Sequence, residues 1–346
     1  MMPGSRTADY DYELPPDRIA QAPLEQRDDS RLMVIRRDTG GIEHARFGDL
    51  PELFASGDAI VLNTTKVLRA RLLGRRTSGA PAEVLLLHPV GGDDVWEAMV
   101  SPGGKLRPGR TVRIADGFDV DVLEITERRT RLVRLRASEP VRDAIARHGH
   151  IPLPPYIARP DEAADATRYQ TVFAREEGSV AAPTAGLHFT SALLDRLAAK
   201  GVQRADVLLH VGAGTFKPVE VDDPAEHVMH EEWYQVSEPA ARTINAARSR
   251  GGRVWAVGTT SARTLESVAD ESGVIRPGHG ETRLFIRPGY RFRAVDKLIT
   301  NFHLPRSTLL MLVAAFAGYE LTMHAYRTAV ADGYRFYSYG DAMAIL

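Results

Sequence analysis

The stretch SALLDRLAAKGVQRADVLLHVGAGTF, residues 191–216, decides the fold class. Its apolar residues first recur at helical spacing over 191–201, with Thr190 placed to cap the helix and Gly201 placed to end it. The run RADVLLHV (204–211) then has the composition of a buried strand, and it leads into a glycine-rich loop. A helix followed by a buried strand is the repeating unit of a sheet that is covered by helices.

The same alternation continues towards the C-terminus. We expect a helix over EPAARTINAARSRGG, a strand over RVWAVG (253–258) and a helix over TTSARTLESVA directly after that strand. A further strand, DKLITNF (296–302), leads into the apolar segment LPRSTLLMLVAAFAG, and SRLMVIRRD and GDAIVLN read as strands near the N-terminus. This order predicts an α/β domain with a parallel or mixed sheet.

Residues 67–149 have a different pattern of apolar and turn-forming residues. Short alternating runs such as AEVLLLHPV, TVRIADG and RTRLVRLRA are separated by turn clusters such as SPGGKLRPG. Closely spaced short strands with Gly and Pro turns predict a small antiparallel β-barrel. We therefore expect a discontinuous α/β catalytic domain, residues 1–66 and 150–346, interrupted by an inserted barrel at 67–149.

Composition restricts the function classes. The 346 residues include no cysteine, which excludes disulfides, thiolate metal sites and a cysteine nucleophile. We see no secretion signal, and the longest apolar run, 308–318, is about half the length that crosses a bilayer. These features predict a cytoplasmic protein that does not enter a membrane. Net charge is −1, yet residues 62–149 hold 16 Lys and Arg against 11 Asp and Glu. A basic segment of this kind marks either a surface for a polyanion or a solvated strand face.

Four stretches are rich in small residues, hydroxyls or histidine, and we call them the bare stretches. They begin where predicted strands end or lie between elements: GSVAAPTAGLHFT (178–190), HVGAGTF (210–216), VGTTSART (257–264) and TNFHLPRST (300–308). In open α/β sheets, ligands bind beyond the carboxyl ends of the strands. Glycines let backbone amides approach a ligand, and helix N-termini attract anions. We expect these stretches to form a ligand wall. The alternative is that their hydroxyls cap helices and their histidines belong to the core.

Other chemistries are weakly supported. GAGTF lacks the third glycine of a dinucleotide fingerprint and opens no helix, which disfavours an NAD-dependent oxidoreductase. His227 and His230, followed by two glutamates, do not follow HExxH order, and no G-x-S-x-G elbow exists. A non-catalytic RNA-binding module remains an alternative, although it gives the strand-end stretches no purpose.

The chain resembles the S-adenosylmethionine:tRNA ribosyltransferase-isomerase family of queuosine biosynthesis over nearly its whole length. The resemblance is carried by long motifs in order, among them DYELPPDRIAQAPLEQRDDSRLMV, VLNTTKVLRARLLGRR, GSVAAPTAGLHFT, HVGAGTFKPV, HVMHEEWYQVSE, VGTTSARTLES, TNFHLPRSTLLMLVAAFAG and RFYSYGDAM. It implies an α/β domain with an inserted β-barrel.

The resemblance also implies the reaction. S-adenosylmethionine would donate its ribosyl group to 7-aminomethyl-7-deazaguanine at the wobble position of tRNAs for Asp, Asn, His and Tyr. The product would be epoxyqueuosine-tRNA, with release of adenine and methionine. No metal and no cofactor beyond S-adenosylmethionine as co-substrate is expected, and we expect a monomer.

This chemistry needs proton transfer at the ribose and at the departing adenine, which suits groups that titrate near neutrality. We predict that His188 and His210 flank the ribose as base and adenine-side donor, in either order, with His303 as a third candidate. The predicted substrate-binding residues are Thr184, Gly186, Gly212, Gly214, Thr215, Thr259, Thr260, Glu231, Glu232 and Asn301. Glu231 or Glu232 would balance the sulfonium charge.

For tRNA we predict phosphate contacts from basic residues of the barrel. They are Arg69, Arg71, Arg75, Arg76, Lys105, Arg107 and Arg110. Tyr337 and Tyr339, in the C-terminal RFYSYGDAM, are expected to stack on the unpaired base, and the alternative is a hydrophobic tail that folds back on the core.

Overall fold

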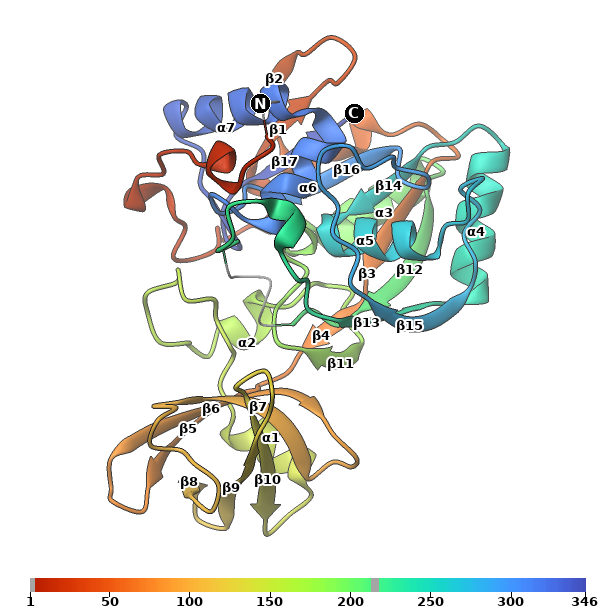
Figure 1. Cartoon of the computed structure of the whole chain (residues 1–346). Helices are drawn as coiled ribbons and strands as arrows, with labels where there is room; N and C mark the ends of the chain where they lie inside the picture. The colour runs from red at the N-terminus through yellow and green to blue at the C-terminus, as the bar shows by residue number, and fades with distance from the viewer. Residues whose placement is uncertain (1–3, 213–217) are drawn as a thin grey trace.

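A computed structural model describes residues 4–212 and 218–346. It consists of an α/β domain, which carries both chain ends, and a separate β-barrel below it (Figure 1). The predicted fold class, an α/β domain with a mixed sheet interrupted by an antiparallel barrel, is confirmed.

Within the described residues, nine strands form one sheet in the order β15-β13-β12-β3-β14-β16-β17-β1-β2. The strands are β1 (Arg31–Ile35), β2 (Ile42–Arg46), β3 (Ala59–Asn63), β12 (Gln203–Leu209), β13 (Glu232–Val236), β14 (Val254–Val257), β15 (Gly278–Thr282), β16 (Lys297–Asn301) and β17 (Ala342–Ile345). The neighbours β12, β3, β14 and β16 run parallel. Their carboxyl ends therefore meet at one edge of the sheet.

Helices cover both faces of this sheet. They are α3 (Ser191–Ala199), α4 (Glu238–Ser249), α5 (Gly258–Val268), α6 (Thr308–Ala317) and α7 (Tyr319–Ala331). Alternate side chains of β3 enter opposite layers, because Val61 packs with the α4–α7 side whereas Ile60 and Leu62 pack with α3. Every residue of β3 is buried, as expected for a parallel strand covered on both faces.

The N-termini of the helices show which of the expected capping residues form capping hydrogen bonds. Thr190 Oγ1 accepts from the backbone N–H of Leu193, and Ser307 Oγ accepts from that of Leu310, so both residues cap helices. Thr259 and Thr260 are not caps, since α5 begins at Gly258 and Val257 stands at its N-cap position without a side-chain bond. Both threonines lie in the first turn of α5.

The second body is a closed barrel of six described strands in the order β10-β7-β6-β5-β8-β9. They are β5 (Arg71–Arg76), β6 (Pro81–Pro89), β7 (Val95–Ser101), β8 (Thr111–Ala115), β9 (Phe118–Ile125) and β10 (Arg131–Ala137). Trp96 and Phe118 fill the interior, and α1 (Val141–His148) adds Ala144 and Ile145 to the same core.

The two bodies are joined by a short parallel ribbon of β4 (Thr65–Val67) and β11 (Glu176–Ser179). The Gln170 side chain bonds both the N–H and the C=O of Val67, at 3.0 and 2.8 Å. The chain leaves the barrel at Gly149, close to Arg69, where it enters.

Of the described helices, no single one is long and apolar enough to span a membrane. The helices α6 and α7 pass such a test only as a pair bent by 117°.

A substitution at Gly149 tests how closely the chain approaches Arg69 at the junction of the two bodies. Its φ is −78°, which any residue adopts, but a Cβ there would overlap the carbonyl oxygen of Arg69. Gly149→Ala should lower the free energy of unfolding by roughly 1–3 kcal/mol, as overpacking does. Gly104→Ala, also in the inserted segment but with no atom within 4 Å of the added Cβ, is the matched control. Urea unfolding measures both, and equal stabilities would contradict this explanation of the junction.

Candidate functional site

The carboxyl edge of the parallel strands is held together by the side chain of Asn63. Its Nδ2 donates to the carbonyl of Leu209 at 3.0 Å and to Thr260 Oγ1 at 3.2 Å. Its Oδ1 accepts from the backbone N–H groups of Leu209 and Thr65, at 3.1 and 3.2 Å. The amide is buried, and it fixes the ends of β3 and β12 and the start of α5 relative to one another.

A hollow of about 50 Å³ lies at this edge, and we call it the strand-end hollow. It brings together residues from all four bare stretches. Its lining includes Thr184, Gly258, Thr259, Thr260, Thr300, Asn301, His303, Val211 and Tyr337. Its volume suits one polar end of a ligand and not a whole nucleoside.

Asn301 lines this hollow, and one of its side-chain atoms is an acceptor without a partner in the described structure. Its Nδ2 lies 3.0 Å from His188 Nε2 and 3.2 Å from the carbonyl of Tyr337, which fixes the amide orientation. Its Oδ1 is buried and has no hydrogen-bond partner in the described structure. Because unpaired buried acceptors are costly, this oxygen is suited to receive a ligand donor.

His188 does not line the strand-end hollow. It ends the 3₁₀ helix η5 (Thr184–His188), and its buried ring is stacked on Phe47, with Nδ1 2.8 Å from Ser30 Oγ. Burial lowers the pKa of His188 to about 3, with smaller contributions from Arg335 and Arg27. The ring is neutral at pH 7, and His188 lines a different space from the one that His210 lines.

His303 lies in the hollow wall but is also enclosed. Its Nε2 is 2.8 Å from Thr300 Oγ1, and its backbone N–H donates to Tyr326 Oη at 3.0 Å. Burial lowers the pKa of His303 to about 3. A ring so far from titration at pH 7 is a poor proton carrier.

His210 is the half-buried histidine of the three, and it lines a much larger space. Its Nδ1 lies 2.9 Å from Thr65 Oγ1, which is 2.7 Å from Ser179 Oγ. The ring stacks on Trp233 with centroids 5.3 Å apart. Gly178 is required here, because a Cβ would overlap the His210 ring. Burial lowers the pKa of His210, and Glu176 opposes that shift.

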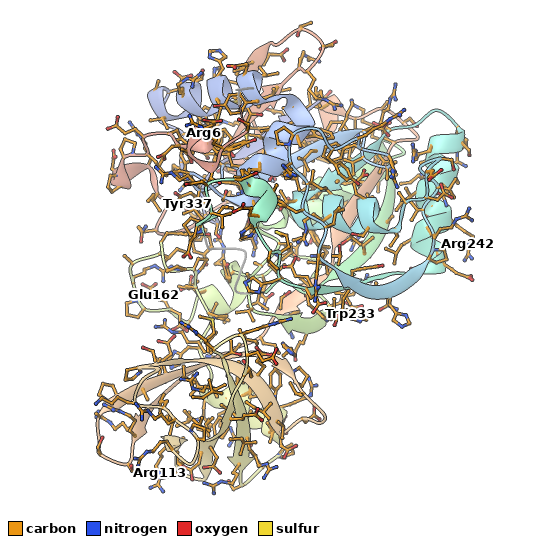
Figure 2. All side chains as sticks on the ribbon, in the orientation of Figure 1. Arg6, Arg113, Glu162, Trp233, Arg242 and Tyr337 are labelled. Carbon is orange, nitrogen blue, oxygen red and sulfur yellow. The ribbon has the colours of Figure 1, made fainter. Side chains whose placement is uncertain are left out.

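The larger space is a cleft of about 940 Å³ between the two bodies, which we call the interdomain cleft. The α/β domain contributes His210, Val211, Gly212 and Trp233, and the barrel contributes Trp96, Met99 and the 128–131 turn. Figure 2 shows Trp233 at the edge of the α/β domain that faces the barrel. Val211 lines both this cleft and the strand-end hollow, so the two spaces are adjacent.

Both predicted glutamates line the cleft but are already paired. Glu231 forms ion pairs with Arg128 of the barrel, at 3.2 Å, and with Arg283. Glu232 is buried against Arg263 and accepts from the N–H of Gly212 at 3.2 Å. Neither carboxylate is an isolated counter-charge for a sulfonium.

The three predicted glycines and Thr215 lie in different surroundings or outside the described residues. Gly212 lines the cleft. Gly186 is explained by packing, since a Cβ there would lie 2.8 Å from both Phe173 and Thr171. Gly214 and Thr215 lie outside the described residues.

The basic residues predicted to contact RNA are spread over the barrel. Arg75 pairs in register with Arg113, which Figure 2 shows at the end of the barrel farthest from the α/β domain. Arg71 makes two bonds of 2.9 Å with Glu83, and Arg69 bonds the carbonyl of Ala146. Arg76 follows Arg75 on β5, whereas Lys105, Arg107 and Arg110 are exposed between β7 and β8.

The two C-terminal tyrosines are buried. Tyr337 has φ +72° and packs on Tyr156, with centroids 4.5 Å apart, where it closes the strand-end hollow. Tyr339 Oη donates to Asp165 at 2.7 Å, and its ring packs edge-on to Tyr169. The structure leaves Tyr339 only 3% exposed, so the folded-back alternative describes it better than a stacking surface does.

Several residues at the site escaped the sequence analysis. Asn63, Thr65 and Ser179 support the edge and His210, while Trp233 and Arg129 line the cleft. The run of polar residues that ends the apolar strand GDAIVLN was the available signal for Asn63 and Thr65. Among residues 4–212 and 218–346, no group of three or more His, Asp or Glu side chains is placed to hold a metal ion.

Known proteins resemble this chain closely. A sequence model of the family described as "Queuosine biosynthesis protein" matches residues 7–345. An S-adenosylmethionine:tRNA ribosyltransferase-isomerase of Symbiobacterium thermophilum is 56% identical, covering 99% of this chain and 100% of the relative. One from Moorella thermoacetica is 55% identical over 99% and 100%. A crystal structure of an S-adenosylmethionine tRNA ribosyltransferase from Thermotoga maritima has a TM-score of 0.56 and 40% identity, covering 97% and 99%.

The burial of His188 predicts how the free energy of unfolding depends on pH. The unfolded chain takes up a proton near the ordinary pKa of 6.5, whereas folded His188 resists protonation down to about 3. The contribution of His188 to the free energy of unfolding is therefore fully present above about pH 6.5. Below that pH it decreases by about 1.4 kcal/mol per pH unit.

His188→Gln should reduce that slope, measured by urea unfolding from about pH 6 to about pH 4. His324→Gln, which removes an exposed histidine on α7, should leave the slope unchanged. A wild-type slope in His188→Gln would contradict a buried neutral imidazole.

Proposed function

The chain belongs to the S-adenosylmethionine:tRNA ribosyltransferase-isomerase family of queuosine biosynthesis, and on this premise we propose its specific reaction. It is an enzyme of tRNA modification that uses S-adenosylmethionine. We propose that it transfers and isomerises the ribosyl group onto 7-aminomethyl-7-deazaguanine at the wobble position of tRNAs for Asp, Asn, His and Tyr. Epoxyqueuosine-tRNA forms, adenine and methionine leave, and the enzyme works as a monomer in the cytoplasm.

The observation that supports this proposal is the adjacency of the strand-end hollow and the interdomain cleft at Val211. A donor and a nucleotide acceptor need separate spaces that meet at the reacting atoms. The hollow accommodates one polar end of S-adenosylmethionine, and the ribose extends past Val211 into the cleft. The acceptor nucleotide, unstacked from the anticodon loop, enters the cleft from the side of the barrel.

The hollow is suited to the methionine end of the donor. The first turn of α5 carries backbone N–H groups without helical partners, and no side chain caps them. Thr259 and Thr260 lie in that turn, and the positive end of the helix favours a carboxylate. Asn301 lines the same hollow, and we assign its buried Oδ1, which has no partner in the described structure, as the acceptor for the ammonium. His188 acts as a positioning residue, because its Nε2 holds the amide of Asn301.

His210 is the proposed proton carrier at the ribose. It lines the cleft beside Val211, and its Nε2 has no hydrogen-bond partner in the described structure. Thr65 Oγ1 can accept from or donate to Nδ1, so it supports either tautomer of the ring. A neutral imidazole can remove the C5′ proton next to the sulfonium or, once protonated, pass a proton to the departing adenine.

His210→Gln tests this assignment. The substitution should lower the turnover number for adenine release from S-adenosylmethionine with modified tRNA by about 10²-fold or more, while donor binding persists. His279→Gln is the matched control, because exposed His279 lies on the other side of Trp233, 6.4 Å from its ring, and does not line the cleft. Near-normal turnover in His210→Gln would show that another group transfers the proton.

A further inference from the structure

A second polar hollow lies between the N-terminal segment, the linker that precedes β11 and the C-terminal segment. We call it the arginine hollow. Its volume is about 20 Å³, and three guanidinium groups line it. Arg27, Arg168 and Arg335 reach it from segments more than 130 residues apart, together with His188, Ser30 and Ser338. No aspartate or glutamate is among the described lining residues.

The first two arginines are held rigidly without being neutralised. Arg27 donates to the carbonyls of Leu187 and Thr167, at 3.0 and 2.9 Å. Arg168 donates to the carbonyls of Leu24 and Glu25, and its buried Nε has no partner in the described structure. Carbonyl oxygens orient a guanidinium but carry no net charge to balance it.

Arg335 is the least constrained of the three. The nearest carboxylate oxygen to its guanidinium, on Asp341, is 3.9 Å away, and within the described structure its side chain makes one hydrogen bond, a 3.5 Å contact with the carbonyl of Ala22. Asp341 already accepts from the backbone N–H groups of Arg31 and Arg335 itself, at 3.0 and 2.8 Å. The Arg335 side chain is 31% exposed, so an anion can reach it from solvent.

Other half-buried arginines of this protein are treated differently. Arg159 forms two bonds with Asp165, and Arg71 forms two with Glu83. At the arginine hollow, by contrast, burial and the neighbouring Arg168 charge both lower the pKa of Arg27. Of the three gathered cations only Arg335 has a carboxylate near it, at 3.9 Å, so the group is unfavourable by itself and a bound anion offsets that cost.

We propose that Arg27, Arg168 and Arg335 form a phosphate-binding site that takes one backbone phosphate of the tRNA. Guanidinium groups suit phosphate because they donate paired hydrogen bonds and stay charged. The inference rests on the proposed function for the identity of the RNA. It places an RNA contact on the α/β domain in addition to the arginines of the barrel.

Arg335→Gln tests the site, because this side chain supports little of the fold. Binding of substrate tRNA is measured by fluorescence anisotropy over a range of KCl concentrations. Loss of one phosphate contact should reduce the slope of log affinity against log salt by about one. Arg335→Lys, which keeps the charge, should restore the slope but not the full affinity. Arg327→Gln removes an equivalent charge from the exposed face of α7 and should leave the slope unchanged.

Two outcomes would overturn the proposal. One is a slope in Arg335→Gln that equals that of wild type or of Arg327→Gln. The other is stabilisation of wild type by inorganic phosphate that is lost in Arg335→Gln while the tRNA slope stays the same, since the site would then bind free phosphate. Adenine release by the wild-type enzyme with modified tRNA tests the proposed function separately, because the binding experiment requires no turnover.

Discussion

The buried amide of Asn63 is the constraint on which the site depends. Its four hydrogen bonds connect the ends of β3 and β12 with the first turn of α5. These elements come from residues near 63, 209 and 260, so nothing local in the sequence holds them in register. A substitution that removed the amide would leave buried backbone groups unpaired and would loosen the hollow and the His210 loop together.

The three candidate histidines near this edge differ in their burial and surroundings. His188 and His303 are enclosed, hydrogen-bonded and neutral, and they hold Asn301 and the β16 loop in place. Of these three, His210 is the one that lines the cleft between the α/β domain and the barrel, and its Nε2 has no hydrogen-bond partner in the described structure. The barrel then completes the cleft, and the ion pair between Arg128 and Glu231 connects it to the α/β domain across that space.

The sequence predicted the elements well because their signals are local. Helical spacing over 191–201, the caps at Thr190 and Ser307, and the apolar strands 204–211 and 253–258 all depend on neighbouring residues. It also predicted which loops meet at the sheet edge, because parallel strands impose that meeting. It could not predict which way a side chain points. His188 and Thr184 belong to one short helix, yet they line different hollows. Gly186 was predicted to line a ligand site, and the sequence did not indicate that it also leaves room for Phe173. The arginine hollow could not be predicted from the sequence, because its residues come together only in the folded chain.

A crystal structure of the enzyme with S-adenosylmethionine bound would show whether the strand-end hollow and the interdomain cleft form one active site across Val211. We expect the methionine carboxylate at the first turn of α5, the ammonium at Asn301 Oδ1 and the ribose within hydrogen-bonding reach of His210. A donor bound entirely in the cleft, away from Asn301, or with its ribose remote from His210, would contradict it.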